Sequence, residues 1–183
     1  MSALRKNVIA PVLMTIAGIA VGIGPAAGQA SSPCDRPEMR QFDFWIGEWD
    51  CHGQYTDSLG EVQRYTLSNA IVSTLDGCVI QERFDGTPFT PLKGISLSTF
   101  DSTDSLWKQT WVDNSGAYLD FAGSFSGGIM TLGRSFVRND STIHQRMRWT
   151  EITDSSFVWL WEKSTDGGAT FEVAWRLDYA RKK

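Results

Sequence analysis

Six residues spread over the chain combine types that can hold or act on a small molecule together. They comprise two carboxylates, a guanidinium, an amide and two indoles: Glu82, Glu162, Arg148, Gln109, Trp107 and Trp111. Mostly apolar walls with a few fixed polar groups are typical of a binding site, because the walls supply affinity and the polar groups set orientation. We therefore predict that these residues line a site for a small, largely apolar molecule.

The carboxylates also allow other functions. Two carboxylates that face one substrate can act as acid and base, as in glycosidases, so an alternative is a small barrel enzyme that uses Glu82, Arg148 and Glu162. An unpaired buried charge costs several kcal/mol, and Arg148 is expected to pair with Glu162 and to reach Glu82. The same residues also permit an ion pair without a ligand, inside the fold or across two strands on its outer face. A third alternative is a structural or interaction module whose interior is filled by its eight tryptophans.

The sequence gives little support for a bound cofactor or for other kinds of catalytic site. The histidines are His52 and His144, and haem bound through His144 is the weaker alternative, since this residue shares strand parity with Arg146 and Arg148. The sequence has no Cys and His cluster with zinc-ligand spacing, no Gly-x-Ser-x-Gly elbow and no phosphate loop. We therefore predict no metal and no cofactor, and we favour binding over catalysis.

The elements that must position these residues are strands. Turn-forming clusters recur about every ten residues, and the segments between them are rich in β-branched and aromatic residues. The predicted strands span residues 48–56, 61–73, 78–85, 93–100, 105–112, 117–125, 129–138, 142–151, 156–164 and 169–180. Short turns require antiparallel neighbours, and closure into an up-and-down barrel removes the unpaired edges. The predicted fold is all-β, a single antiparallel, lipocalin-like barrel of about ten strands over residues 31–183.

An aromatic segment before the first strand is expected to close one end of the barrel. Residues Phe42–Trp49 hold four large aromatic side chains, whose burial is worth roughly 25 cal/mol per Å² of apolar area. Residues 40–46 are predicted to form a short helical plug. Trp49 should be almost fully buried beneath a basic side chain, with Arg181 or Arg176 as the candidates for a cation–π contact.

The first 30 residues are typical of a signal peptide. Arg5 and Lys6 precede an apolar run over residues 8–23, and the segment ends in the small-residue sequence Gly28-Gln29-Ala30. No other segment approaches the ~20 apolar residues of a membrane helix. We expect an exported protein, periplasmic or secreted, without an integral membrane span.

Charge argues against a nucleic-acid partner. The formal net charge of the chain is −4. It becomes −6 without residues 1–30, which carry two basic and no acidic side chains. No basic patch is available to neutralise phosphates. The sequence does not indicate an oligomeric state.

The three cysteines, Cys34, Cys51 and Cys78, leave at least one thiol outside any intramolecular disulfide. Cys51 shares strand alternation with Trp49, which is typical of a buried small hydrophobe. This favours a disulfide between Cys34 and Cys78, in keeping with an oxidising compartment.

The segment 164–171 resembles the Asp-box hairpin of sialidase propellers, with Phe171 in place of tryptophan. Asp166 can accept backbone N–H bonds across its own turn, and the two following glycines suit positive φ angles. Propellers repeat the motif in every blade, whereas it occurs once here. We interpret it as a turn clamp without a catalytic role.

Several short motifs together resemble a bacterial family of exported proteins labelled as a domain of unknown function, number 1579. They are Pro37-Glu38 with residues 40–49, Gly77 to Ile80 with Glu82, Trp107 to Gln109, Trp111 to Asp113 with Gly116, Met130 to Leu132, Arg148 to Thr150, and Glu162 with Ser164 and 166–171. The chain departs from the family at Cys51 and Phe171. The resemblance implies the fold and export alone. The chain is also, more distantly, similar to fatty-acid-binding and nitrobindin-like barrels, and the nitrobindin-like ones bind haem through a histidine. This similarity is an analogy of fold.

Overall fold

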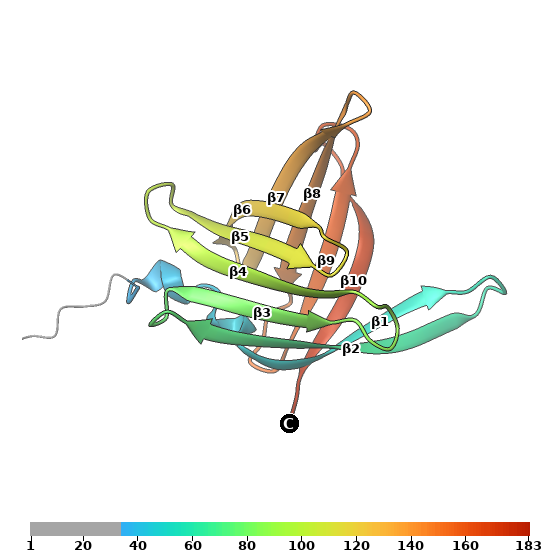
Figure 1. Cartoon of the computed structure of the whole chain (residues 1–183), viewed down its shortest axis with the longest axis horizontal. Coiled ribbons are helices and arrows are strands. Elements are labelled where there is room, and N and C mark those ends of the chain that lie inside the picture. The colour runs from blue at the N-terminus through green and yellow to red at the C-terminus, as the bar shows by residue number, and fades with distance from the viewer. Residues whose placement is uncertain (1–33) are drawn as a thin grey trace, which may run out of the picture. The chain divides into compact units, whose positions relative to one another are not determined.

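Ten antiparallel strands form one closed sheet in the computed structural model, which describes residues 34–183 (Figure 1). The strands are β1 (Gly47–Thr56), β2 (Val62–Thr74), β3 (Val79–Asp85), β4 (Lys93–Asp101), β5 (Leu106–Asp113), β6 (Tyr118–Ser126), β7 (Ile129–Arg138), β8 (Ser141–Thr150), β9 (Ser156–Ser164) and β10 (Glu172–Arg181). Each strand pairs with the next in the chain, and β10 closes the barrel on β1. The predicted single antiparallel barrel of about ten strands is confirmed, whereas the predicted signal peptide lies outside the described residues.

Nine strands begin and end within one residue of their predicted bounds, and the tenth begins three residues late, at Glu172. The delay follows from the turn clamp. The Asp166 carboxylate accepts hydrogen bonds from the backbone N–H of Thr170 at 3.0 Å and from its hydroxyl at 2.6 Å. Ser164 donates to Asp166 at 2.6 Å, so the clamp holds the chain in a loop up to Thr170 before the ladder resumes.

Two short 3₁₀ helices, η1 (Pro37–Arg40) and η2 (Asp43–Trp45), form the plug. Phe42, Trp45 and Trp49 are all buried, and the exposed fraction of Trp49 is 0%. The Arg181 guanidinium lies over the Trp49 ring with its Cζ 4.3 Å from the ring centroid. Arg181 Nη1 also donates to the Ile46 carbonyl at 2.8 Å. The predicted cover on Trp49 is confirmed.

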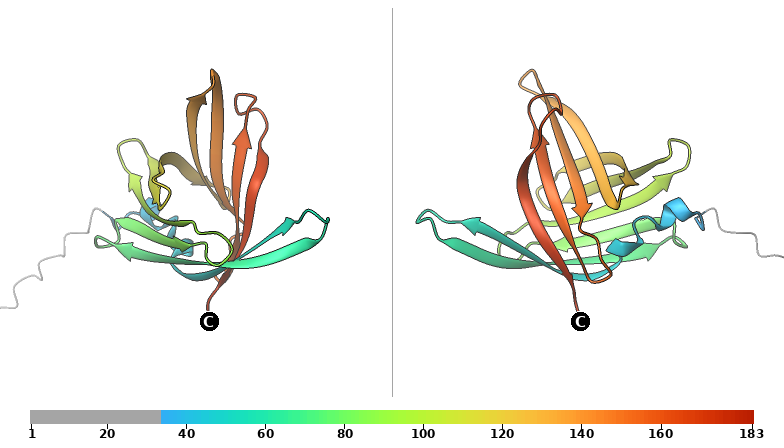
Figure 2. Two further views of the ribbon diagram at one scale, coloured as in Figure 1. Left: turned by 45° about the vertical axis from the view of Figure 1, so that its right-hand side comes forward. Right: turned by 180° about the vertical axis from the view of Figure 1, so that it is seen from behind.

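Gly47 marks the point where the chain leaves the plug and enters β1. Its φ angle is +143°, and a Cβ there would lie 2.1 Å from Arg181 Nη1. Only glycine therefore permits Arg181 to reach Trp49. The plug lies at the opposite end of β1 from the turn that joins β1 to β2, which projects beyond the neighbouring strands (Figure 2).

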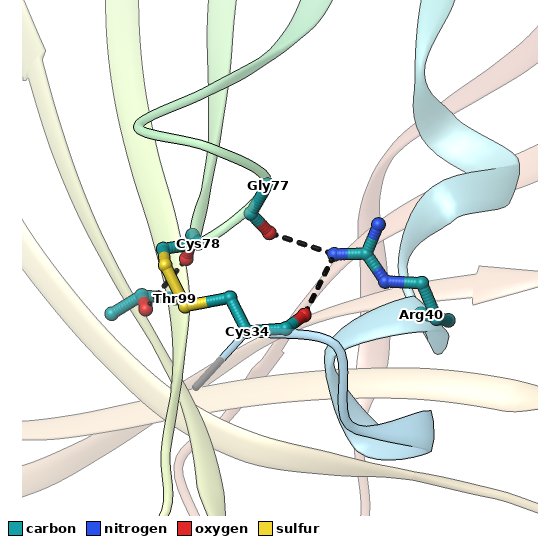
Figure 3. The surroundings of a disulfide bond; sticks show 5 residues. All are labelled: Cys34, Arg40, Gly77, Cys78 and Thr99. Atoms are coloured by element: carbon teal, nitrogen blue, oxygen red, sulfur yellow. Dashed lines mark hydrogen bonds between the residues drawn. A yellow bond between two sulfur atoms is a disulfide. The ribbon is translucent and has the colours of Figure 1, made fainter. Parts of the chain in front are cut away.

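The disulfide between Cys34 and Cys78 is present, with its Cα atoms 5.0 Å apart (Figure 3). Arg40 Nη2 donates to the Gly77 carbonyl at 2.7 Å, and Thr99 Oγ1 donates to the Cys78 carbonyl at 2.9 Å. The disulfide and the Arg40 bond fasten the plug to the turn between β2 and β3, and the Thr99 bond ties the same turn to β4. Cys51 is buried and outside any disulfide, as predicted.

Candidate ligand-binding cavity

A cavity of about 210 Å³ lies inside the barrel and is lined mainly by aromatic side chains. The wall includes eight rings from six strands: Phe84, Trp111, Phe121, Trp149, Trp159, Trp161, Trp175 and Tyr179. Leu92, in the loop between β3 and β4, and Asp113, at the end of β5, place its rim at the barrel end remote from the plug. The aromatic plug therefore fills one end of the interior and leaves the other end hollow.

Most neighbouring rings in the wall pack edge to face, whereas Trp159 and Trp161 are stacked with an interplanar angle of 29°. The Phe84 and Trp175 planes meet at 89° with centroids 6.0 Å apart, and Trp159 and Trp175 meet at 85° and 5.5 Å. Phe121 and Trp161 meet at 79° and 5.7 Å. Edge-to-face pairs are the preferred aromatic geometry because a positive ring edge meets a negative face. The rings therefore hold one another in place with π faces turned in different directions.

A layer of buried polar side chains crosses the interior beside the cavity. Glu82 Oε2 accepts from Ser96 Oγ at 2.6 Å, and Glu82 Oε1 accepts from Asn69 Nδ2 at 2.7 Å. Asn69 Nδ2 also donates to the Tyr179 hydroxyl at 3.0 Å, while the Asn69 amide oxygen has no hydrogen-bond partner among the described residues. The layer therefore leaves one buried acceptor, the Asn69 amide oxygen, without a donor among the described residues.

Burial controls the charge of this layer. The exposed fraction of Glu82 is 7%, and no ion pair of Glu82 is present within residues 34–183. Desolvation raises the pKa of the Glu82 carboxyl, against the opposing effect of the bonds from Ser96 and Asn69. Burial likewise raises the pKa of Tyr179 well above its usual range and that of Cys51 to about 12. Without a charged partner, Glu82 is biased towards its neutral form.

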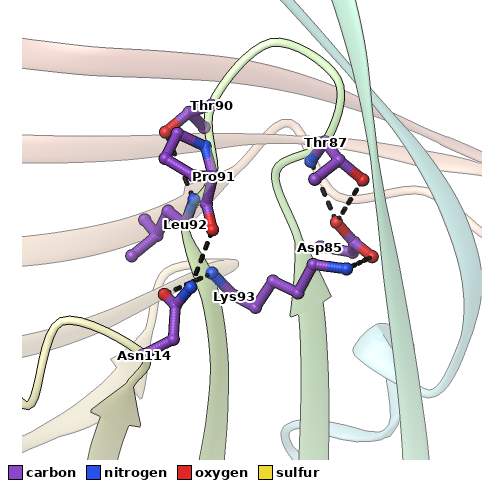
Figure 4. A network of polar contacts seen from close by, with 7 residues as sticks. All are labelled: Asp85, Thr87, Thr90, Pro91, Leu92, Lys93 and Asn114. Atoms are coloured by element: carbon purple, nitrogen blue, oxygen red, sulfur yellow. Dashed lines mark hydrogen bonds and ion pairs between the residues drawn. The ribbon is translucent and has the colours of Figure 1, made fainter.

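The rim of the cavity is held by a network of polar contacts around the loop between β3 and β4 (Figure 4). Lys93 Nζ donates to Asp85 Oδ2 at 2.8 Å, and this bond holds the pKa of Asp85 well below its usual range. Asn114 Nδ2 donates to the Pro91 carbonyl at 2.8 Å, and its Oδ1 accepts from the Lys93 N–H at 2.9 Å. The contacts fix the backbone on both sides of Leu92, whose side chain faces the cavity.

Aromatic contacts extend from the rim towards the outer end of the barrel. The Phe89 and Tyr65 rings are stacked at 3.7 Å with an interplanar angle of 3°. Tyr65 accepts a hydrogen bond from Trp175 Nε1 at 2.8 Å. A Cβ at Gly53 would lie 2.3 Å from the Tyr65 ring, so glycine is needed there for the ring to lie across β1. These contacts connect the loop to the cavity wall.

The structure brings three of the six predicted site residues together. Glu82, Gln109 and Trp111 line the cavity, and Gln109 Nε2 donates to Ser98 Oγ at 2.9 Å. Trp107 shares their inner face but belongs to the plug region. Its ring centroid lies 5.3 Å from that of Phe42, and its Nε1 donates to Gln41 Oε1 at 3.1 Å.

Arg148 and Glu162 do not line the cavity, and their expected position is corrected. Residues Met147 and Trp149 of β8 face the cavity, so strand alternation places Arg148 on the outer face. Glu162 pairs there with Arg148, 3.6 Å from Arg148 Nη1, and with Arg146. The outer-face ion pair anticipated as an alternative is what the barrel contains.

Neighbouring side chains explain why Glu162 is buried on an outer face. Its exposed fraction is 5%, and the Cζ of Arg146 lies 3.7 Å from the Phe171 centroid. Two guanidiniums and this ring shield the carboxylate from water. Glu82 and Glu162 therefore lie on opposite faces of the barrel wall and cannot flank one substrate as an acid and base pair.

Neither histidine faces the cavity. His144 pairs in register with Ser135 and Ser164, on the parity opposite to Met147, and His52 Nδ1 is 3.0 Å from Thr66 Oγ1 at the surface. The placement gives no support to haem ligation through His144. Within residues 34–183, no group of three His, Cys, Asp or Glu side chains is arranged to hold a metal ion.

Sequence reasoning missed the partners of Glu82. Asn69 and Ser96 are ordinary polar residues within strands, and Tyr179 resembles any aromatic core residue. The available signal for an inward-facing Asn69 was its position on the same strand face as apolar residues. Asn69 follows Leu67 and precedes Ile71 with the spacing of two that marks one face, and both of these neighbours are buried.

Comparison with known proteins supports the fold. The chain is similar to the crystal structure of Rv2717c from M. tuberculosis, with a TM-score of 0.51 and 9% sequence identity over 81% of this chain and 99% of that chain. No protein-family model and no curated protein matches the chain, so the predicted resemblances of sequence are not confirmed. Within residues 34–183, no helix has the length and apolar character needed to cross a membrane. A likeness at this low identity establishes a shared barrel fold.

Proposed function

We propose that this protein is exported and binds a small, largely apolar molecule inside its barrel. The aromatic cavity beside a buried polar layer is the observation that carries the proposal. Its volume of about 210 Å³ is below the 300–1,000 Å³ typical of pockets for drug-sized ligands. The ligand is therefore compact, with an apolar body against the rings and a polar group directed at Glu82 or Gln109.

The disulfide supports the export part of the proposal. Disulfides persist in oxidising compartments and are rare in the cytosol, and Cys34 lies close to the end of the predicted signal peptide. A periplasmic or secreted binding protein needs no cofactor for this role. Purification of the mature protein from a culture fraction with N-terminal sequencing would show a start near residue 31 if export and cleavage occur.

Native mass spectrometry of protein purified from its own cells tests the binding function. We expect a bound small molecule that is released on denaturation. Leu119 lines the cavity, so Leu119→Phe should reduce the bound fraction by filling the space. Leu97→Phe is the matched control, because Leu97 is 44% exposed on the outer face. Equal ligand occupancy in both variants would contradict the assignment of the site.

A further inference from the structure

The charges around the cavity are unbalanced. Two carboxyl groups, those of Glu82 and Asp113, line it, and no Lys, Arg or His side chain does. Bonds from Ser115 and Trp111 lower the pKa of Asp113 to about 2. The rim therefore carries a negative charge, and the interior holds a carboxyl group, that of Glu82, with no cationic side chain in the lining beside it.

The Glu82 carboxyl has hydrogen-bond donors but lacks a cation. Ser96 and Asn69 each donate one bond to it at 2.6 and 2.7 Å. A buried carboxylate normally has an ionic partner as well, because its desolvation costs several kcal/mol. The second buried glutamate, Glu162, has two such partners in Arg146 and Arg148. Among the described residues, Glu82 therefore lacks the cationic partners that Glu162 has.

The titratable groups that face Glu82 do not provide a positive charge. From β1 comes the Cys51 thiol, with a pKa raised to about 12, and from β10 the Tyr179 phenol, with a pKa well above its usual range. The neighbouring strands contribute uncharged groups: Asn69 from β2, Ser96 from β4 and Gln109 from β5. On β7 the Arg134 guanidinium stacks on Phe136 at 4.9 Å and lies 5.7 Å from the Phe121 centroid, outside the cavity lining.

The aromatic walls suit the same kind of group. The face of an indole or phenyl ring attracts a cation within about 6 Å of its centroid, and tryptophan is the strongest of the three aromatic residues. Five tryptophans line the cavity, and rings such as Trp159 and Trp175 stand nearly perpendicular to each other. A positively charged nitrogen among such faces gains attraction from more than one direction. Its alkyl substituents also gain apolar contact.

The geometry points to a compact organic ammonium ion as the ligand class, with its nitrogen between the Glu82 carboxylate and the tryptophan faces. This assignment rests on the proposed function, because it names the chemistry of the molecule held in the same cavity. The ligand gives Glu82 the positive charge that Arg146 and Arg148 give Glu162. Binding then favours the ionised form of Glu82 and releases its proton when the carboxyl was neutral beforehand.

A matched pair of probes tests the assignment on the mature protein. Choline carries a permanent positive charge, and 3,3-dimethylbutan-1-ol is its neutral isostere with carbon in place of nitrogen. Calorimetric titration should show that choline binds about tenfold more tightly, a gain of about 1.4 kcal/mol to which the tryptophan faces and the Glu82 carboxylate contribute together. Choline affinity should also rise with pH through the titration of Glu82, since the charge of the probe does not change.

Variants connect the preference to one side chain. In Glu82→Gln, the preference for choline over the neutral alcohol should fall, because the carboxylate is lost while the tryptophan faces remain, and choline affinity should lose its pH dependence. Glu162→Gln is the control for removing a buried glutamate, and it should retain the tenfold preference. The neutral alcohol should bind Glu82→Gln as it binds the unsubstituted protein, which shows that the cavity is intact.

The outcomes separate this assignment from the proposed function. Equal affinities for choline and the neutral alcohol, or an unchanged preference in Glu82→Gln, would overturn the ammonium assignment while the binding cavity stands. Failure of both probes to bind, together with no small molecule in the native mass spectrum, would overturn the cavity function and the assignment with it.

Discussion

The two ends of the barrel interior use the same residue types for different purposes. At the plug, Phe42, Trp45 and Trp49 are in contact with other rings and are at most 1% exposed. At the cavity, Trp159 and Trp175 sit on the equivalent inner face but remain partly exposed. The difference is the chain segment before β1, which supplies filling atoms at one end. Aromatic residues on an inner face therefore become core or ligand wall according to what covers them.

The largest loss of stability is expected from a substitution at Trp49, in the closed end. Trp49→Ala should lower the free energy of unfolding by about 3–5 kcal/mol, because it leaves a cavity in the closed end and removes the contact with Arg181. Urea denaturation measures the change. Trp159→Ala is the matched test in the hollow end. It should cost about 1 kcal/mol, because one side of that ring already lacks packing partners.

Equal losses in Trp49→Ala and Trp159→Ala would show that the two ends are packed alike. The comparison would then be wrong. An increase in ligand-free cavity volume with only a small loss of stability is expected in the Trp159 variant alone.

The disulfide should stabilise the plug end more than the cavity end. Reduction of Cys34–Cys78, which spans a sequence separation of 44 residues, should lower the free energy of unfolding by about 2–4 kcal/mol. Hydrogen exchange should increase in residues 34–46 and change little in β5 and β6. Thiol labelling of the native oxidised protein should leave buried Cys51 unmodified, and rapid labelling of Cys34 or Cys78 would contradict the pairing.

The pH dependence of stability should report the burial of Glu82. The pKa of Glu82 is raised in the folded state, so the folded protein binds more protons than the unfolded chain above the usual titration range of glutamate. Stability should therefore fall as pH rises through that window, with a slope of at most about 1.4 kcal/mol per pH unit. Glu82→Gln should remove this part of the slope. Denaturation at a series of pH values measures it, and an unchanged profile would show that Glu82 has an ionic partner.

The smallest effect on stability is expected from Gln109→Leu, a nearly isosteric change in the cavity wall. Loss of the bond to Ser98 should cost about 1 kcal/mol. Ligand affinity should change more than stability, because Gln109 is one of the few polar groups in an apolar wall. Thermal unfolding and ligand occupancy by native mass spectrometry give the two values. Unchanged occupancy would restrict the polar contact with the ligand to Glu82.

Local signals carried most of the strand predictions. Asx and glycine turns were visible because their chemistry acts over a few residues, as in the clamp of Asp166 on Thr170. The plug was visible because so much aromatic area in a short segment must be covered. The pairing of Cys34 with Cys78 followed from the alternation of Cys51 with Trp49, again a pattern of one strand.

The site was predicted less completely, because it depends on which face of each strand is inside. Along β8, Arg146 and Arg148 alternate with Met147 and Trp149, and the complementary glutamate on β9 made an inner ion pair plausible. Only the register of β8 with β7 and β9, in which Arg148 lies opposite Thr131 and Leu160, places Arg148 on the outer face. The Phe171 ring and the guanidiniums of Arg146 and Arg148 bury Glu162 on that outer face, so its burial does not place it inside the barrel.

By itself, the sequence determined the number and approximate bounds of the strands, the closed end and the disulfide. The strands and the closed end follow from interactions between residues near in the chain or from one apolar cluster, and the disulfide follows once Cys51 is assigned to a buried strand position. The tertiary structure decided that the other end is hollow and that Glu82 meets Asn69, Ser96 and the tryptophan walls without a cation. Those contacts join strands far apart in sequence, and their geometry depends on barrel closure and register. Alternation defines two faces for every strand, but it cannot assign the polar partners that meet across the interior.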